Sequence, residues 1–300
     1  MASLEQRLLK QSTLMMALVA VCGIFFGLFA ASQSILFDGI FSVVATLIKI
    51  LMLITARLIA RESSRRFQFG YWHLEPIAML VEGGFLLLIA VYAMSSGILG
   101  LLSGGHAINF GLASLYAALF TLIDFGYYAY LRRRNRRLNS PLVRFDTLSW
   151  MTDGILSLGL LCAFVCAWIL ADTGYRALTP YLDPLILVVI SLIIAPTALR
   201  ASMPAIRDLL QMVPGSLDQQ VRETMQAFVA RHGLAGFTSY VQRSGRARFI
   251  EIHVLLAENA EIGTIARLDG WREEIASALG EAAPERWLTI SFTSEPRWAE

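Results

Sequence analysis

The chain has 300 residues, of which 56% are hydrophobic and only 16% are charged. This balance excludes an ordinary soluble domain, where about 25% of the residues are charged, and it indicates a membrane protein. The formal net charge of +2 identifies no charged partner, and three cysteines provide no disulfide framework. The sequence contains no nucleophile–base pair and no phosphate-binding loop, so we expect neither an enzyme nor a prosthetic group.

Six apolar runs are long enough to cross a bilayer, for which about 20 residues are needed. They cover residues 12–31, 33–60, 74–102, 107–131, 141–171 and 180–200. The first run follows Lys10 and has full spanning length, so we expect a retained membrane helix and no cleaved signal peptide. The second and fifth runs exceed the bilayer thickness and should tilt or continue beyond the membrane surface.

Basic residues gather in the links on one side of these spans. Four arginines lie between Arg57 and Arg66 after the second run, and six lie between Arg132 and Arg144 after the fourth. Since positive residues favour the cytoplasmic side, we expect a multi-pass protein of the cell membrane (the inner membrane, if bacterial) with both termini in the cytoplasm. An arginine run can also bind nucleic acid, but its place between two spans favours the topological interpretation, without nucleic acid.

The chain changes character after about residue 203. Two amphipathic helices and three alternating strands are expected there, at residues 216–231, 240–242, 249–256, 262–279 and 287–292. Their order, αββαβ, predicts a small two-layer α+β domain of ferredoxin-like topology. We therefore expect a six-helix transmembrane domain at 1–203 and a cytoplasmic α+β domain at 204–300.

Two acids interrupt the second and fifth spans, Asp38 and Asp153. An ionisable side chain at membrane depth is costly, and it persists where it faces a bundle interior or a water-filled path. Each acid follows a serine by four residues, Ser34 and Ser149, which places serine and acid one turn apart on one helical face. If the two pairs face each other, they form an oxygen-lined cation site. Manganese accepts oxygen ligands, whereas zinc prefers nitrogen and sulfur, so we expect Mn²⁺ or Fe²⁺ ahead of Zn²⁺.

These residues also have structural interpretations. A buried acid can be satisfied by a neighbouring hydroxyl, and serines are common where membrane helices pack. Lys49, Glu82 and Asp124 lie inside the second, third and fourth spans, where an ion pair of the lysine with one of these acids is favoured over a role in cargo binding. Asp146, near the start of the fifth span, could extend a path toward the cytoplasm or pair with Arg144.

Three motifs are similar to those of a known family. They are Phe-Gly-Tyr at 69–71 with Glu-Pro at 75–76, Leu-Val-Arg-Phe-Asp-Thr-Leu-Ser at 142–149, and Ser-Glu-Pro at 294–296. With six helices before an αββαβ domain, the chain resembles the cation diffusion facilitators over nearly its whole length. The resemblance implies a homodimeric secondary transporter that exports divalent metal cations from the cytoplasm by proton antiport, with the cytoplasmic domain mediating dimerisation.

The proposed transport site departs from the family's pattern. Ser34 stands where zinc-carrying members have Asp or His, and Ser149 where they have His, while Asp38 and Asp153 keep the acids. Histidine is the usual proton carrier near neutral pH. Without it, the two acids would have to take up protons when the metal leaves, because two nearby carboxylates do not both stay charged.

The family's other metal positions have also changed. Phe67 and Tyr71 replace histidines near the link between the second and third helices. In the cytoplasmic domain, His253 and Glu295 fall where ligands occur in the family, but other ligand positions hold apolar or hydroxyl residues, which are Phe237, Ala266 and Thr293. The alternative function is therefore a non-transporting member of the family with a structural or regulatory role.

Overall fold

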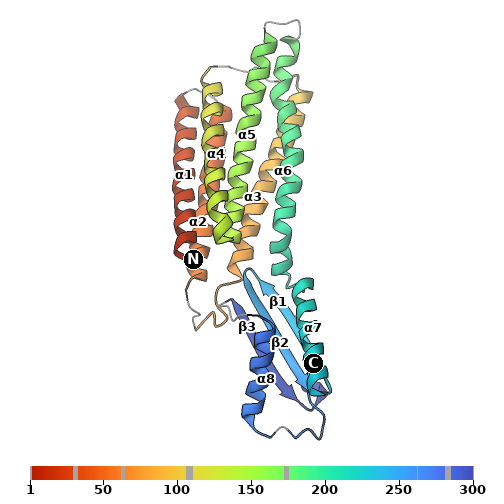
Figure 1. Ribbon diagram of the computed structural model, residues 1–300. Helices are drawn as coiled ribbons and strands as arrows, with labels where there is room; N and C mark the ends of the chain where they lie inside the picture. Colours follow the sequence, from red (N-terminus) through yellow and green to blue (C-terminus); the bar gives the residue numbers. More distant parts are fainter. Residues whose placement is uncertain are drawn as a thin grey trace. The chain divides into compact units, whose positions relative to one another are not determined.

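The computed structural model describes residues 2–29, 33–61, 65–105, 111–171, 176–261, 263–280 and 285–299. The chain divides into two compact units, Met1–Ile206 and Arg207–Glu300. The first unit is built from long helices, and the second is a three-stranded sheet with two helices (Figure 1).

Six long helices follow one another before the sheet. They are α1 (Ala2–Phe29), α2 (Gln33–Ile59), α3 (Leu74–Leu102), α4 (Gly111–Leu138), α5 (Pro141–Ala171) and α6 (Thr179–Leu209), with a short 3₁₀ turn, η1 (Arg176–Leu178), before α6. Of the described residues, those of α1, α2, α3, α5 and α6 form helices long and apolar enough to span a membrane. The remaining helix, α4, is apolar at first but ends in the arginine run 132–137. It therefore continues past the predicted end of the fourth span at residue 131, and residues 107–110 of that span lie outside the described residues.

The helices of the first unit pack mainly in two pairs, α1 with α2 and α4 with α5. Small residues permit the first pairing, because a Cβ on Gly39 would lie 2.5 Å from the backbone nitrogen of Ile24. A tight turn joins α4 to α5: Asn139 adopts a positive φ of 51°, and the Asn135 side chain bonds the Ser140 backbone nitrogen at 2.9 Å and the Ser140 carbonyl at 3.1 Å. Each pair is thus held by contacts of its own.

The second unit has the order α7, β1, β2, α8, β3. Its elements are α7 (Gly215–His232), β1 (Gly236–Ser244), β2 (Ala247–Leu255), α8 (Ile265–Ala278), β3 (Arg286–Thr293) and η2 (Pro296–Trp298). Strand β2 lies between β1, which runs antiparallel to it, and β3, which runs parallel. The αββαβ order expected from the sequence is therefore confirmed.

Hydrophobic residues on the inner faces of α7, α8 and the sheet form the core of the second unit. Val221 and Met225 of α7 are fully buried against Ile252 of β2 and Ile275 of α8. Strand β1 is longer than the predicted 240–242, because its first residues pair with the end of β2, from Gly236 opposite Leu255 onward. That extension depends on the partner strand, and local alternation does not reveal it.

Candidate cation site

The acids Asp38 and Asp153 lie on helices of different pairs, α2 and α5. The Tyr116 hydroxyl of α4 donates a hydrogen bond of 2.6 Å to Asp38 Oδ2. Asp153 is half-buried on α5, and its carboxylate is close enough to Asp38 for the two charges to interact. The structure therefore brings the two predicted acids into one electrostatic neighbourhood. Their joint binding of a cation stays a prediction.

A third acid, Asp124 of α4, belongs to the same neighbourhood. Its Oδ2 accepts a hydrogen bond of 3.1 Å from Ser157 Oγ, and its charge interacts with those of Asp153 and Asp38. Asp124 thus joins Asp38 of α2 and Asp153 of α5 in one electrostatic neighbourhood, although the Asp38 side chain itself is exposed. Because like charges in a low-dielectric interior repel strongly, the group calls for a cation or for bound protons.

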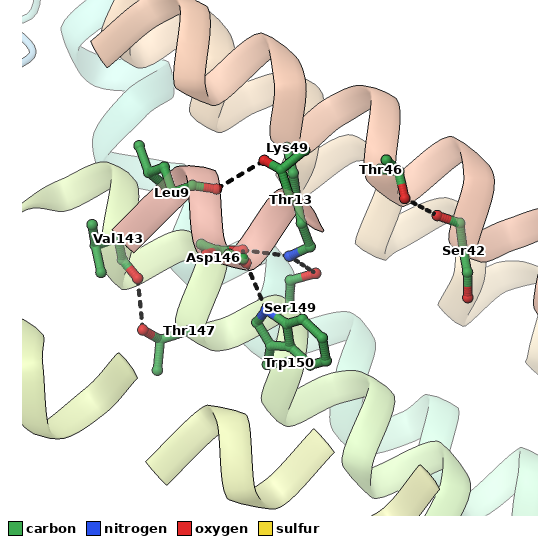
Figure 2. Close-up of polar contacts among 11 residues, drawn as sticks. Leu9, Thr13, Ser42, Thr46, Lys49, Val143, Asp146, Thr147, Ser149 and Trp150 are labelled. Carbon is green, nitrogen blue, oxygen red and sulfur yellow. Dashed lines mark hydrogen bonds and ion pairs between the residues drawn. The ribbon is translucent and has the colours of Figure 1, made fainter. Parts of the chain in front are cut away.

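Lys49 of α2 pairs with Asp146 of α5, and both side chains are buried, at 1% and 0% exposure (Figure 2). The Asp146 carboxylate also accepts a 2.9 Å hydrogen bond from Ser12 Oγ of α1, and the Trp150 indole N–H donates 2.8 Å to the same hydroxyl. The ammonium lies 5.2 Å from the centre of the Trp150 ring. From the sequence we expected Asp146 either to extend a cation path or to pair with Arg144, and Lys49 to pair with Glu82 or Asp124. The structure pairs Asp146 with Lys49.

Ser149 lies one turn before Asp153, as its spacing requires, but it contacts the lysine. Lys49 Nζ is 3.5 Å from Ser149 Oγ, and Ser149 also interacts with the Glu82 carboxyl group of α3. Figure 2 shows the ammonium between Asp146 and this hydroxyl. Ser34 lies on α2, but its side chain is outside the described residues.

Several buried carboxylate oxygens have no hydrogen-bond donor among the described residues. They are Glu82 Oε2, Asp146 Oδ2 and Asp153 Oδ2. A buried polar atom that lacks a partner is costly, and native structures rarely keep one unless a ligand, ion or water completes its contacts. These atoms therefore mark the region around the lysine as able to receive a further cation or proton.

Comparison with known proteins assigns the chain to a family. Residues 9–210 match the cation efflux transmembrane domain, which covers more than half of the chain. The chain belongs to the cation efflux family. It is 25% identical over 250 residues to the cation-efflux pump FieF of Shigella boydii serotype 18, a match that covers 83% of this chain and 80% of the relative. The FieF pumps of Escherichia coli O139:H28 and Citrobacter koseri are 24% identical, over 250 and 249 residues, with the same coverage.

This membership confirms the resemblance that the motifs indicated, and the apolar helices make the chain a multi-pass membrane protein. The function that membership supports is efflux of metal cations, which agrees with the expectation that the protein is not an enzyme. In the described parts of this cation efflux protein, no three His, Cys, Asp or Glu side chains are grouped so as to hold a metal ion. A bound cation would therefore need hydroxyl, backbone or water oxygens beside the acids.

Some neighbours of the acids in this cation efflux protein were missed by sequence reasoning. Ser42 is buried one turn after Asp38 on α2, at 8% exposure, and reading the four-residue spacing forward as well as backward would have found it. The Tyr116 hydroxyl and the Ser12 hydroxyl are different, because their partners lie 78 and 134 residues away in the chain. No local pattern signals such contacts.

The family's other metal positions hold aromatic and hydrogen-bonded side chains. The Phe67 ring is tilted against that of Tyr71, with 4.8 Å between ring centres, and stacks on that of His73 at 5.6 Å. On the sheet, His253 Nδ1 is 2.6 Å from Ser291 Oγ, and its Nε2 is 3.6 Å from Glu251. The expectation that the family's usual ligand set is incomplete at both places stays a prediction.

Proposed function

We propose that the protein is a secondary transporter that exports divalent metal cations from the cytoplasm through the site formed by Asp38 and Asp153. The observation that carries the proposal is the buried Asp153 Oδ2, which lacks a donor among the described residues and lies within electrostatic reach of two further acids. A membrane helix keeps such an acid where an ion passes. The relatives named as cation-efflux pumps support the same direction of function.

The cargo is a cation that accepts oxygen ligands. The acids and hydroxyls offer no nitrogen or sulfur, so Mn²⁺ or Fe²⁺ should be preferred to Zn²⁺. Ser149 and Ser34 are proposed as additional oxygen ligands, and Ser42 is a further hydroxyl on the face of Asp38. The exchanged ions are protons, because three mutually repelling carboxylates, once they lose the metal, are relieved by taking up protons.

The transport direction rests on the topology proposed for the helices. The links rich in arginine are placed in the cytoplasm, which puts both termini there and the second unit on the same side. Family resemblance supports a homodimer in which the second unit mediates the contact between two copies. The protein itself would reside in the cell membrane, or in the inner membrane of a bacterium.

A non-transporting family member is the second candidate, and two observations favour it. Lys49 reaches Ser149, so a positive side chain already touches one of the proposed ligands. The described residues also hold no cluster of three strong ligands. Under this alternative, the fold would be kept for a structural or regulatory contact, and the acids would serve only to hold the helices together.

Metal uptake into proteoliposomes separates the two functions. The full-length protein is reconstituted, and uptake of Mn²⁺, Fe²⁺, Co²⁺ and Zn²⁺ is followed together with internal pH. Transport predicts metal-driven proton movement that Asp153→Asn and Asp38→Asn reduce to the level of empty liposomes. Asp269→Asn, on the exposed face of α8, is the matched control and should transport like the wild type. Absence of uptake by the folded wild type would favour the structural role.

A further inference from the structure

We infer that Lys49 is a tethered counter-cation: its ammonium group occupies part of the cation site while cargo is absent and competes with the arriving metal ion. The inference rests on the proposed function, because it assigns a role within the same site. The contacts of the Lys49 side chain carry it.

The Lys49 ammonium lies between the Asp146 carboxylate and the Ser149 hydroxyl. On one side it pairs with Asp146, and on the other it lies 3.5 Å from Ser149 Oγ. Ser149 is one helical turn from Asp153 on α5, so a side chain that contacts the hydroxyl stands beside the acid proposed to bind cargo. The charge of Asp153 also acts on that of Lys49, more weakly than the charges of Asp146 and Glu82. A small shift therefore moves the positive charge toward the cargo position or away from it.

The charges around the ammonium are not balanced. The carboxyl groups of Glu82, Asp146 and Asp153 all interact with the single amine of Lys49. Each of these acids keeps a buried oxygen that has no donor in the described part of the chain. One ammonium cannot neutralise three carboxylates, and a fully buried pair is stable only where its remaining lone pairs are satisfied. Two of the three acids therefore hold protons while cargo is absent or leave room for a second cation beside the lysine.

The side chain has the properties that such a role requires. Lysine carries a compact charge on a flexible stem with three donors, so it can exchange one oxygen partner for another. Two donors are directed at Asp146 and Ser149 in this structure. A metal ion held by the Ser149 hydroxyl would stand close to the ammonium, and like charges in contact repel strongly. Binding of the metal must therefore move the ammonium away from Ser149, so that Asp146 alone keeps it.

The alternative is a purely structural ion pair that locks α2 to α5. The two roles differ in the sign of their effects on metal affinity. If the pair is structural, replacing either partner damages the same contact, and both variants change in the same direction. If Lys49 competes with cargo, its removal strengthens metal binding. Removal of the Asp146 charge frees the ammonium to move toward Asp153 and weakens metal binding.

The test measures Mn²⁺ binding to the purified full-length protein from the electron paramagnetic resonance signal of free Mn²⁺. We expect Lys49→Met to lower the Kd at least about tenfold, since a like-charge contact costs more than the roughly 1.4 kcal/mol that a factor of ten represents. Asp146→Asn should raise the Kd, and Lys49→Arg, which keeps the charge, should stay near the wild type. Lys10→Met, at an exposed position on α1, is the matched control and should leave the Kd unchanged.

A Kd that moves in the same direction in Lys49→Met and Asp146→Asn, or that neither variant changes, overturns the inference. If Lys49→Met does not fold, the same comparison is made in the Asp146→Asn background, where adding Lys49→Met removes the ion pair as a unit and must again lower the Kd about tenfold. Binding is measured apart from transport. A wild type that binds Mn²⁺ but moves none refutes the proposed function and leaves the order of the Kd values to decide the role of Lys49. A wild type that binds no Mn²⁺ refutes both.

Discussion

Replacing Gly39 by alanine should separate α1 from α2 and destabilise the first unit. The new Cβ would lie 2.5 Å from the Ile24 nitrogen and 2.7 Å from the Gly23 carbonyl carbon, where ordinary contacts begin at 3.4 Å. Both neighbours are backbone atoms, so no side chain can move aside, and the helices must part by roughly 1 Å to restore van der Waals separation. Gly39 adjoins Asp38, so the same shift would displace the acid.

The expected cost can be estimated from two opposing effects. Overpacking of a close contact costs about 1–3 kcal/mol, and a backbone clash belongs at the upper end. Alanine is favoured over glycine inside a helix by about 1 kcal/mol, which offsets part of this cost. The free energy of unfolding should therefore fall by about 2 kcal/mol, which changes the ratio of folded to unfolded protein by roughly thirtyfold.

Two glycines provide matched controls for this experiment. An alanine at Gly84 on α3 or Gly126 on α4 would meet no described atom within 4 Å. These variants should gain up to about 1 kcal/mol from helix propensity alone. Equilibrium unfolding of the full chain in mixed micelles, followed by circular dichroism, compares all three. If Gly39→Ala unfolds no earlier than Gly84→Ala, the close approach of α1 and α2 is not as described.

Three further substitutions test other contacts. Ser12→Ala leaves the buried Trp150 N–H without its hydroxyl partner and should lower the free energy of unfolding by about 1–3 kcal/mol. A change below a few tenths of a kcal/mol in the same unfolding assay would contradict the hydrogen bonds described for Ser12. Tyr116→Phe removes the donor that competes for Asp38 and should lower the Kd for Mn²⁺ by a factor of roughly 2–10 in the resonance titration, whereas a higher Kd would mean that the hydroxyl helps to bind metal. Ile252→Ala opens a cavity in the second unit and should cost about 2–5 kcal/mol, visible as an earlier loss of sheet signal on denaturation and not as a change in Mn²⁺ binding.

The fold follows from patterns that are local in the chain. Apolar runs of spanning length predicted the six helices, and alternating residues predicted the order of the second unit, because each pattern reflects which face of one element is buried. The acid Asp153 could be identified for the same reason, since a single charged residue inside a span is conspicuous without knowledge of its neighbours.

The partners of the site residues could not be derived in this way. Lys49 and Asp146 are 97 residues apart, and the local sequence instead offered Arg144 as the partner of Asp146. Which of them meets the acid depends on the rotation of α5 about its axis and on how α2 crosses it, and both are set by packing along the whole helix. The same rotation turns Ser149 toward Lys49. Its four-residue spacing from Asp153 suggested a cation ligand but did not indicate this contact with the lysine.

The pairing of α1 with α2 and of α4 with α5 divides the acids between two bodies. Asp124 and Asp153 lie on the hairpin of α4 and α5, whose helices are joined by the short turn at Asn139. Asp38 lies on the other pair. Rocking of one pair against the other would change the distance from Asp38 to the remaining two acids, while those two keep their separation. Such a movement would open or close the site between one helix pair that carries two acids and another that carries one.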